Sequence, residues 1–299
     1  MIRFNWNYVI LLKKAHFYGK IKNYNKPEFI KEKTMDKRTE IINRFYDGYV
    51  EDTRLSRSRH GQLEYLTTMK YIHQVLPEKA SIIEVGAGTG RYSVALAKEG
   101  YDVTAIELAK SNLEFLRRNS NGLENITSYQ GDALDLSRFH DNTFDLTLVL
   151  GPLYHLYDEG DQQKALDEAI RVTKDGGTIM VAFLSVHAIL FDNYFQGNLC
   201  AGLEENFTED YHVKHFTEQL FTGFNVDEFE ALFGNKPVEW ITTAAADSIL
   251  ELAEGRGDFA MSDEDFRAFT KYHLNNCEKR ELLGCSSHLL YMCRKVKHE

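Results

Sequence analysis

Two stretches near the start of the chain place apolar residues every three or four positions. In residues 39–49 they include Ile42 and Phe45, and residues 61–75 repeat the same spacing. This spacing gathers the apolar side chains on one side of a helix. The sequence therefore predicts two helices, and Pro77 ends the second one before the first strand begins.

Short apolar runs then alternate with amphipathic stretches through the middle of the chain. The runs predict strands at 81–85, 101–106, 126–129, 144–150, 178–184, 237–243 and 288–294, and the amphipathic stretches predict helices near 91–99, 110–119 and 161–173. Alternation of this kind is typical of an α/β fold with a parallel, doubly wound sheet. Such sheets bind ligands at the carboxyl ends of their strands.

Two longer stretches interrupt the alternation and predict helical caps. Residues 186–233 are rich in aromatic and acidic residues, and residues 246–283 have helical spacing. We therefore divide the chain into a basic extension at 1–34, N-terminal helices at 35–80, a ligand-binding core at 81–185, a helical cap insertion at 186–236, and the last strands with a second helical insertion at 237–299.

The charge of the chain is unevenly distributed. The formal net charge is -10, and residues 1–34 hold eight Lys or Arg against two Glu, so the segment carries +6 and the remaining residues carry -16. An acidic body repels phosphate backbones, which disfavours nucleic acid as a partner. The basic extension fits either an interfacial helix or an upstream segment without a folded role, and its few apolar residues favour the second interpretation.

Membrane insertion and export are not expected. Residues 7–12 are too short and too polar to span a membrane, and no small-residue cleavage site follows them. The four cysteines form no CxxC pair, which is typical of free thiols in a reducing compartment. These features predict a cytoplasmic protein, and they leave its oligomeric state undetermined.

The glycine-rich loop after the first strand carries most of the functional information. Residues 84–90 read Glu-Val-Gly-Ala-Gly-Thr-Gly, a helix follows, and the next strand ends at Glu107. The glycines let a ligand lie against the backbone, and an acid at a strand tip can bind a ribose diol. A dinucleotide loop has the spacing Gly-x-Gly-x-x-Gly, so Gly-x-Gly-x-Gly disfavours NAD.

With Glu84 in front, this loop resembles motif I of the class I S-adenosylmethionine (SAM) methyltransferases. Glu107 matches the ribose-binding acid of that family, residues 131–133 match its third-strand tip, and residues 148–154 match its fourth strand and following loop. The resemblance covers residues 81–185 and implies a Rossmann-like, mostly parallel, seven-stranded sheet whose last two strands are antiparallel. Residues 59–64 also resemble the lead-in of a bacterial subgroup with mostly unassigned substrates.

The resemblance implies a set of residues that bind SAM. Glu84 and the glycines approach the methionine half or support the loop, Glu107 binds the ribose, and Asp132 accepts from the adenine amino group or caps the following turn. The full set is Arg59, Glu84, Gly86, Ala87, Gly88, Gly90, Glu107, Leu108, Asp132, Ala133 and Leu150. Tyr46 and Tyr92 either touch the cofactor or serve packing alone.

Methyl transfer is a direct displacement, so the enzyme mainly has to hold the nucleophile in line and exclude water. Tyr154 and His155 follow the fourth strand, where the family places residues that face the methyl group. His155 can take a proton from an amine or hydroxyl, or it can hold the loop by hydrogen bonds. Gly151 and Leu153 depart from the Asn/Asp-Pro-Pro-Tyr pattern of DNA amino-methyltransferases, which disfavours base methylation.

Basic residues and possible metal ligands add two further hypotheses. Arg54, Arg57, Arg59 and His60 form a compact basic group that either binds a carboxylate or is solvated. The pairs His212–His215 and His273–Cys277 lack a complementary second pair at ligand spacing, so no metal site is predicted.

The sequence thus predicts a SAM-dependent methyltransferase that acts on a small, partly apolar molecule. A methyltransferase for RNA or protein and a catalytically silent SAM-binding protein remain as alternatives. A nicotinamide oxidoreductase is disfavoured by the glycine spacing.

Overall fold

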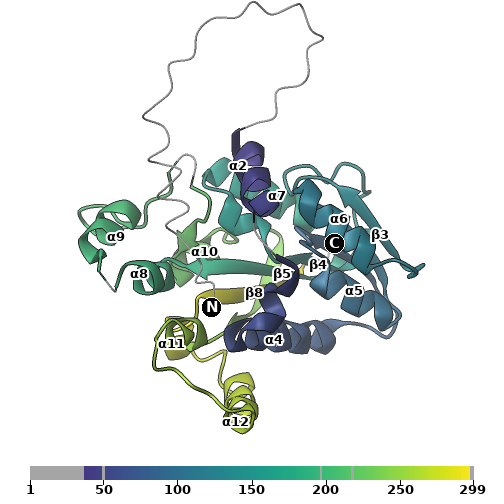
Figure 1. The fold of residues 1–299 in the computed structure, drawn as a ribbon. Helices are drawn as coiled ribbons and strands as arrows, with labels where there is room; N and C mark the ends of the chain where they lie inside the picture. The colour runs from purple at the N-terminus through teal and green to yellow at the C-terminus, as the bar shows by residue number, and fades with distance from the viewer. Residues whose placement is uncertain (1–36, 49–50, 196, 217–218, 297–299) are drawn as a thin grey trace, which may run out of the picture. The chain divides into compact units, whose positions relative to one another are not determined.

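The strands predicted from the apolar runs form one sheet. The computed structural model describes residues 37–48, 51–195, 197–216 and 219–296, so the predicted basic extension at 1–34 lies outside the described residues. The strands are β1 (Ser81–Val85), β2 (Asp102–Glu107), β3 (Ile126–Gln130), β4 (Phe144–Val149), β5 (Thr173–Ser185), β6 (Gly223–Phe224), β7 (Val238–Ala245) and β8 (His288–Lys295). Their arrangement is shown in Figure 1.

The strand order is β3-β2-β1-β4-β5-β8-β7, which confirms the predicted seven-stranded path. β1 to β5 pair in parallel, and β8 runs antiparallel to both β5 and β7. The prediction missed an eighth strand, β6, which pairs in parallel with the end of β5. A strand of two residues is too short to show the alternation of apolar and polar residues by which strands are predicted.

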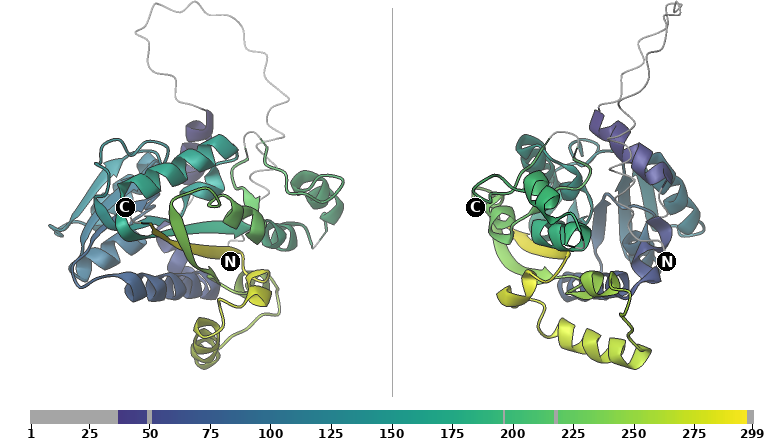
Figure 2. Two further views of the ribbon diagram at one scale, coloured as in Figure 1. Left: turned by 180° about the vertical axis from the view of Figure 1, so that it is seen from behind. Right: turned by 60° about the vertical axis from the view of Figure 1, so that its left-hand side comes forward.

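Helices cover both faces of this sheet. The helices are α2 (Lys37–Gly48), η2 (Glu51–Thr53), α3 (Arg54–Arg57), α4 (Arg59–Val75), α5 (Arg91–Lys98), α6 (Lys110–Asn119), η3 (Pro152–His155), α7 (Glu159–Val172), α8 (Val186–Tyr194), α9 (Leu199–Asn206), α10 (Val226–Ala231), α11 (Leu250–Glu254), α12 (Asp263–Leu274) and α13 (Arg280–Leu283). α4 and α5 lie on one face and α7 on the other, as Figures 1 and 2 show. The two predicted N-terminal helices are therefore confirmed as α2 and α4.

Polar side chains fix where the long helices begin. The Ser58 hydroxyl accepts a hydrogen bond from the Gly61 N–H at the start of α4, and the Asp158 carboxylate accepts from the Asp161 N–H at the start of α7. Each contact satisfies one of the backbone donors that a helix leaves unpaired in its first turn.

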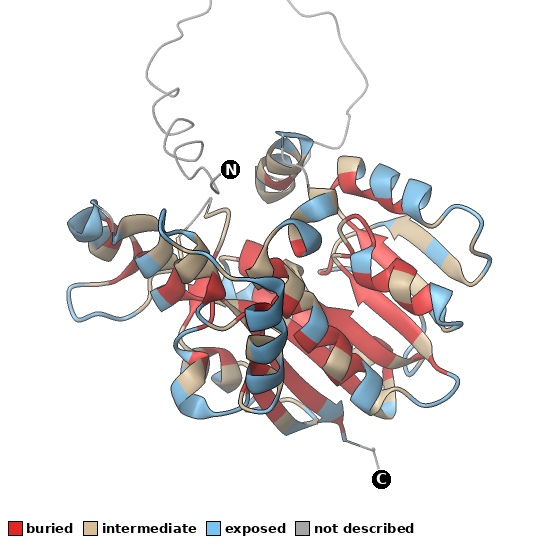
Figure 3. Cartoon of the chain, turned by 60° about the horizontal axis from the view of Figure 1, so that its bottom comes forward, coloured by how far each residue is buried: buried red, intermediate tan, exposed pale blue. Residues whose placement is uncertain are grey.

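The central strands are buried on both faces, as Figure 3 shows. Ile82, Ile83, Leu148 and Ile179 have no exposed surface, which explains why these strands read as continuous apolar runs. The glycine loop thus stands on a rigid support.

The two interruptions of the alternation are largely helical, as predicted. The first holds α8, α9, β6 and α10, and the second holds α11, α12 and α13. α8 contacts α11, so the two insertions meet beside the sheet. Within the described ranges, no helix is both long and apolar enough to cross a membrane.

Candidate functional site

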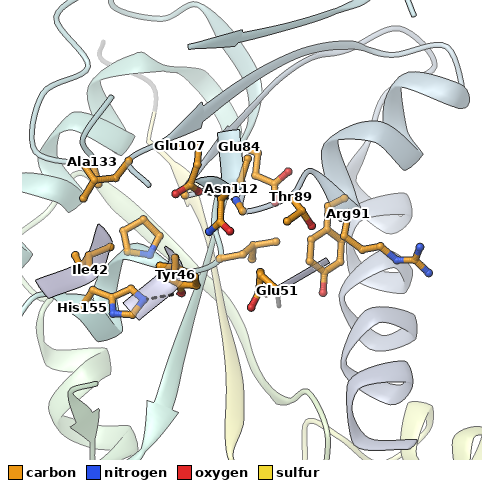
Figure 4. A pocket seen from close by; sticks show the side chains of 18 of the residues that line it. Ile42, Tyr46, Glu51, Glu84, Thr89, Arg91, Glu107, Asn112, Ala133 and His155 are labelled. Atoms are coloured by element: carbon orange, nitrogen blue, oxygen red, sulfur yellow. Dashed lines mark hydrogen bonds between the residues drawn. The ribbon is translucent and has the colours of Figure 1, made fainter. Parts of the chain in front are cut away.

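A pocket opens at the carboxyl ends of β1, β2 and β4. It encloses about 890 Å³ including its open mouth, which is within the range of small-molecule sites. Figure 4 shows side chains that line it. The lining includes Arg38, Ile42, Tyr46, Glu51, Arg54, Glu84, Gly86, Ala87, Gly88, Tyr92, Glu107, Leu108, Asn112, Asp132, Ala133, Leu150, Pro152, Tyr154 and His155. Two predicted cofactor residues, Gly90 and Arg59, lie outside this lining.

The glycine loop has a backbone that only glycine adopts without strain. Gly86 has a φ of 75°, and a Cβ there would lie 2.6 Å from Cδ of Pro152. The N–H groups of Gly86 and Ala87 both donate to the Ile106 carbonyl, which ties the loop to β2. Gly90 has a φ of 86° at the start of α5 and packs against Leu116. Its role is therefore to turn the chain into the helix.

Replacing Gly86 with alanine is expected to lower the free energy of unfolding by about 1–2 kcal/mol, because an L side chain at positive φ is strained. The displaced Pro152 side chain should also disturb the pocket wall. Urea unfolding measures the loss. Gly257→Ala is the matched control because a Cβ there meets nothing within 4 Å. Equal stability of the two variants would contradict the strain assigned to Gly86.

Glu107 holds the loop and keeps acceptor capacity for a ligand. Its side chain is buried, and it accepts hydrogen bonds from the N–H groups of Gly88 and Ala109, each at 2.7 Å. A carboxylate offers about four acceptor positions, and the Asn112 side chain also hydrogen-bonds to Glu107, so about one position remains for a ribose hydroxyl. Burial raises the pKa of Glu107 to about 7.

Glu84 supports the first turn of α5. It is buried and accepts hydrogen bonds from the N–H and the hydroxyl of Ser93. Burial, together with the negative charge of the nearby Glu107, raises the pKa of this carboxyl to about 8. Of the two predicted roles for Glu84, these contacts favour support of the loop.

Of the two roles that the sequence left open for Asp132, the structure shows the turn cap. Its Oδ1 accepts from the Leu134 N–H at 3.1 Å, which is a turn cap. Its Oδ2 forms an ion pair with Arg38 of α2. Leu108, Ala133 and Leu150 line the pocket beside it. Arg38 could not be predicted as a pocket residue, because in the sequence it is only one of several basic residues in an amphipathic helix.

Arg59 lies away from the pocket, which departs from the cofactor-binding role predicted for it. Its guanidinium lies 4.7 Å from the centroid of the Phe266 ring and pairs with Asp263 on α12. Ser58 has an extended backbone at the break between α3 and α4, which redirects the chain. Arg54 lines the pocket instead, where it pairs with Glu51 at 2.8 Å and with Glu64 at 2.6 Å.

Tyr154 and His155 line the pocket from η3, close to Gly86. The Tyr154 hydroxyl donates to the Leu150 carbonyl at 3.0 Å. The two ring nitrogens of His155 lie 2.7 Å from the Leu220 carbonyl oxygen and 3.0 Å from the Tyr46 hydroxyl. Burial lowers the pKa of His155 to about 4, so the ring is neutral at pH 7. Tyr92 is also in the lining, and its phenol is buried.

The histidines weighed as metal ligands have other partners. His212 pairs with Asp210, His215 with Glu228, and His273 contacts the Thr67 hydroxyl. One group of three potential ligands occurs in the described ranges: Glu64, Asp247 and His288.

This group is a buried ion-pair network. Glu64 accepts from Arg54, and Asp247 accepts from His288 at 2.7 Å and from the N–H of Ser287 at 3.0 Å. Because these contacts use the carboxylate oxygens and the His288 Nδ1, the group is explained without an ion.

Comparison with known proteins agrees with the geometry. Residues 82–177 match a family model described as a methyltransferase domain. A demethylmenaquinone methyltransferase from Clavibacter sepedonicus is 34% identical over 126 residues, which are 42% of this chain and 49% of that protein. A glycine/sarcosine N-methyltransferase from Parasynechococcus marenigrum is 32% identical over 103 residues, 34% of this chain and 36% of that protein. Residues 82–177 are therefore similar to the methyltransferase domain family.

The fold of the family extends over most of the chain. A solved SAM-dependent methyltransferase from Thermotoga maritima is 19% identical and has a TM-score of 0.53, covering 87% of this chain and 100% of that chain. The matches in sequence are shorter, and the chain spans about half the length of the curated relatives that it matches first. The shared fold therefore reaches further than the shared sequence.

The pocket fits the cofactor of this family. SAM has no phosphate. The loop offers a side-chain-free surface at Gly86 and Gly88, and two of the arginines that line the pocket, Arg38 and Arg54, are paired with carboxylates. Glu107 at the tip of β2 keeps acceptor capacity for a ribose hydroxyl, and Asp132 lies at the tip of β3. Leu108, Ala133 and Leu150 supply apolar surface for a flat base.

Proposed function

We propose that this protein transfers a methyl group from SAM to a small molecule by direct displacement. The observation that carries the proposal is the buried Glu107 carboxylate, bonded to the backbone of a glycine loop that opens into the pocket. In this arrangement the loop approaches the amino acid half of the cofactor, and Glu107 grips the ribose. Asp132 accepts from the adenine amino group while Arg38 holds its other oxygen.

Direct displacement mainly requires the protein to position the methyl acceptor and SAM relative to each other. Bound SAM supplies an activated methyl group on a sulfonium. Tyr154 and His155 lie on the loop after β4 and form the wall where the acceptor is held, and the His155 ring is available to take up the proton that the acceptor loses. Because its ring is neutral at pH 7, Nε2 carries a lone pair.

A small acceptor is favoured over a macromolecule. The two curated relatives described above are named for small acceptors, and the net charge of -16 outside the first 34 residues repels nucleic acid. The two relatives are named for different methyl acceptors, demethylmenaquinone and glycine or sarcosine. Similarity to this domain therefore does not indicate which atom receives the methyl group. The cytoplasmic location inferred from the cysteines stays a prediction.

Calorimetry with SAM, S-adenosylhomocysteine and NAD⁺ tests the proposal. We expect one molecule of SAM or S-adenosylhomocysteine to bind per chain and NAD⁺ not to bind. Binding of NAD⁺ without SAM would overturn the assignment and favour an oxidoreductase.

The role of Asp132 can be measured in the same assay. Asp132→Ala is expected to weaken SAM binding about tenfold, because it removes a charge-assisted acceptor for the adenine. Asp135→Ala is the control, since Asp135 lies three residues further on and outside the lining of the pocket. Equal affinities of both variants for SAM would reject the adenine role.

A further inference from the structure

A hydrogen-bonded chain with a fixed direction runs from the backbone to the wall of the pocket. It consists of the Leu220 carbonyl, the His155 ring and the Tyr46 hydroxyl. A carbonyl oxygen can only accept, so Nδ1 of His155 must carry the proton that lies between them. The other nitrogen, Nε2, then presents its lone pair to Tyr46.

The direction follows from the charge state of His155. Burial keeps its ring neutral at pH 7, so the ring holds one proton, and that proton is on Nδ1. Tyr46 therefore donates its own proton to Nε2 across 3.0 Å. Any further hydrogen bond at the Tyr46 oxygen must come from a donor.

Both members of this pair face the site. Tyr46 comes from α2 and His155 from η3, they line the same pocket, and Figure 4 shows the contact between them. Aromatic rings surround the pair. The centroids of the Phe221 and Tyr154 rings lie 5.0 and 5.1 Å from that of His155, and Phe45 lies 5.4 Å from Phe221.

We propose that Tyr46 accepts a hydrogen bond from the methyl acceptor, which therefore carries an O–H or N–H group at the atom that is methylated. The inference rests on the proposed function and narrows its substrate class. The rings of Tyr92 and Tyr154, which line the same pocket, further favour a flat, aromatic acceptor. Tyr46 is then a catalytic residue, and His155, which acts through Tyr46, is a positioning residue.

The proposed proton movement balances. As the acceptor's lone pair forms the bond to the methyl carbon, the pair of the carbon–sulfur bond returns to sulfur. The acceptor proton passes to the Tyr46 oxygen, while the proton of Tyr46 passes to Nε2 of His155. One positive charge leaves the sulfur and one forms on the imidazole ring, so the net charge of the pocket does not change.

Binding of two matched probes tests this inference without a known substrate. We would load the full-length protein with S-adenosylhomocysteine and titrate it with 1-naphthol and with 1-methoxynaphthalene, which lacks the donor. The wild type is expected to bind 1-naphthol about tenfold more tightly than its methyl ether. In Tyr46→Phe the two affinities should agree within about twofold. In Tyr65→Phe, which removes a phenol outside the pocket lining, the preference should stay.

The outcomes separate this inference from the proposed function. If S-adenosylhomocysteine fails to bind the wild type, the proposed function fails. If it binds both the wild type and Tyr46→Phe, three results would overturn only the role of Tyr46. These are no binding of 1-naphthol, equal binding of the two probes to the wild type, and a preference that persists in Tyr46→Phe. A persistent preference would mean that the methyl ether is rejected by its size.

Discussion

Replacing His288 with glutamine is expected to lower the free energy of unfolding by about 3 kcal/mol at pH 7. His288 lies at the start of β8, and its Nδ1 donates to the fully buried carboxylate of Asp247 at 2.7 Å. Glu64 lies 3.8 Å from the same nitrogen. Burial by itself lowers the pKa of His288, but Glu64, Asp247 and Glu251 raise it to about 9. The ring is therefore a cation that holds α4 and β8 together.

The pH dependence of this loss has a definite sign. The folded-state pKa of His288, about 9, lies above the value of about 6.5 in an unfolded chain. The stabilisation is thus fully present below about pH 6.5 and is lost as the pH rises through about 9. The difference between wild type and His288→Gln should be largest near pH 6 and should shrink towards pH 10.

Urea unfolding of both proteins at pH 6, 7, 9 and 10 measures this dependence. His73→Gln is the control, because the His73–Glu99 pair is about half exposed and surface pairs contribute little. A difference between wild type and His288→Gln that stays constant from pH 6 to pH 10 would show that the loss comes from packing and not from charge.

Replacing Glu107 with glutamine is expected to weaken SAM binding about 10- to 100-fold. The amide keeps one acceptor oxygen and turns an NH₂ group towards one of the two N–H groups that Glu107 now satisfies. The ribose loses its acceptor position. A lost hydrogen bond between a ribose hydroxyl and a charged acceptor costs about 1.5–3 kcal/mol, and about 1.4 kcal/mol is tenfold in affinity. The N–H group left without a partner destabilises the free and the SAM-bound protein alike and changes the affinity little.

The same residue should make SAM binding depend on pH. Burial raises the pKa of Glu107 to about 7, and only the ionised carboxylate accepts at both oxygens without donating. SAM affinity of the wild type should therefore rise between pH 6 and pH 8, and this rise should flatten in Glu107→Gln. Calorimetry at three pH values measures it. Glu114→Gln, on the exposed face of α6, should behave as the wild type, and an equal loss of affinity there would exclude a specific role for Glu107.

The core of the fold could be predicted because its signals are local. Residues 81–107 contain, in order, β1, the glycine loop, α5 and β2. The strands and the helix are recognised by the spacing of their apolar residues, and the loop by glycines at positive φ. β6 was not predicted, because a strand of two residues is too short to show an alternation of apolar and polar residues. Arg59 was assigned to the cofactor because its neighbours resemble a family segment, whereas the break at Ser58 directs it to Phe266.

The sequence by itself determined the order of strands and helices, the loop at residues 84–90 and the acid at Glu107, because periodicity and backbone preference act between near neighbours in the chain. Only the tertiary structure decided that Tyr46 meets His155 across 109 residues and that Arg38 meets Asp132 across 94. The tertiary structure also brings the carboxylates of Glu64 and Asp247 close to the ring of His288. Such contacts depend on how α2 and α4 pack against the sheet that contains β8, and the spacing of residues along the chain does not predict this packing.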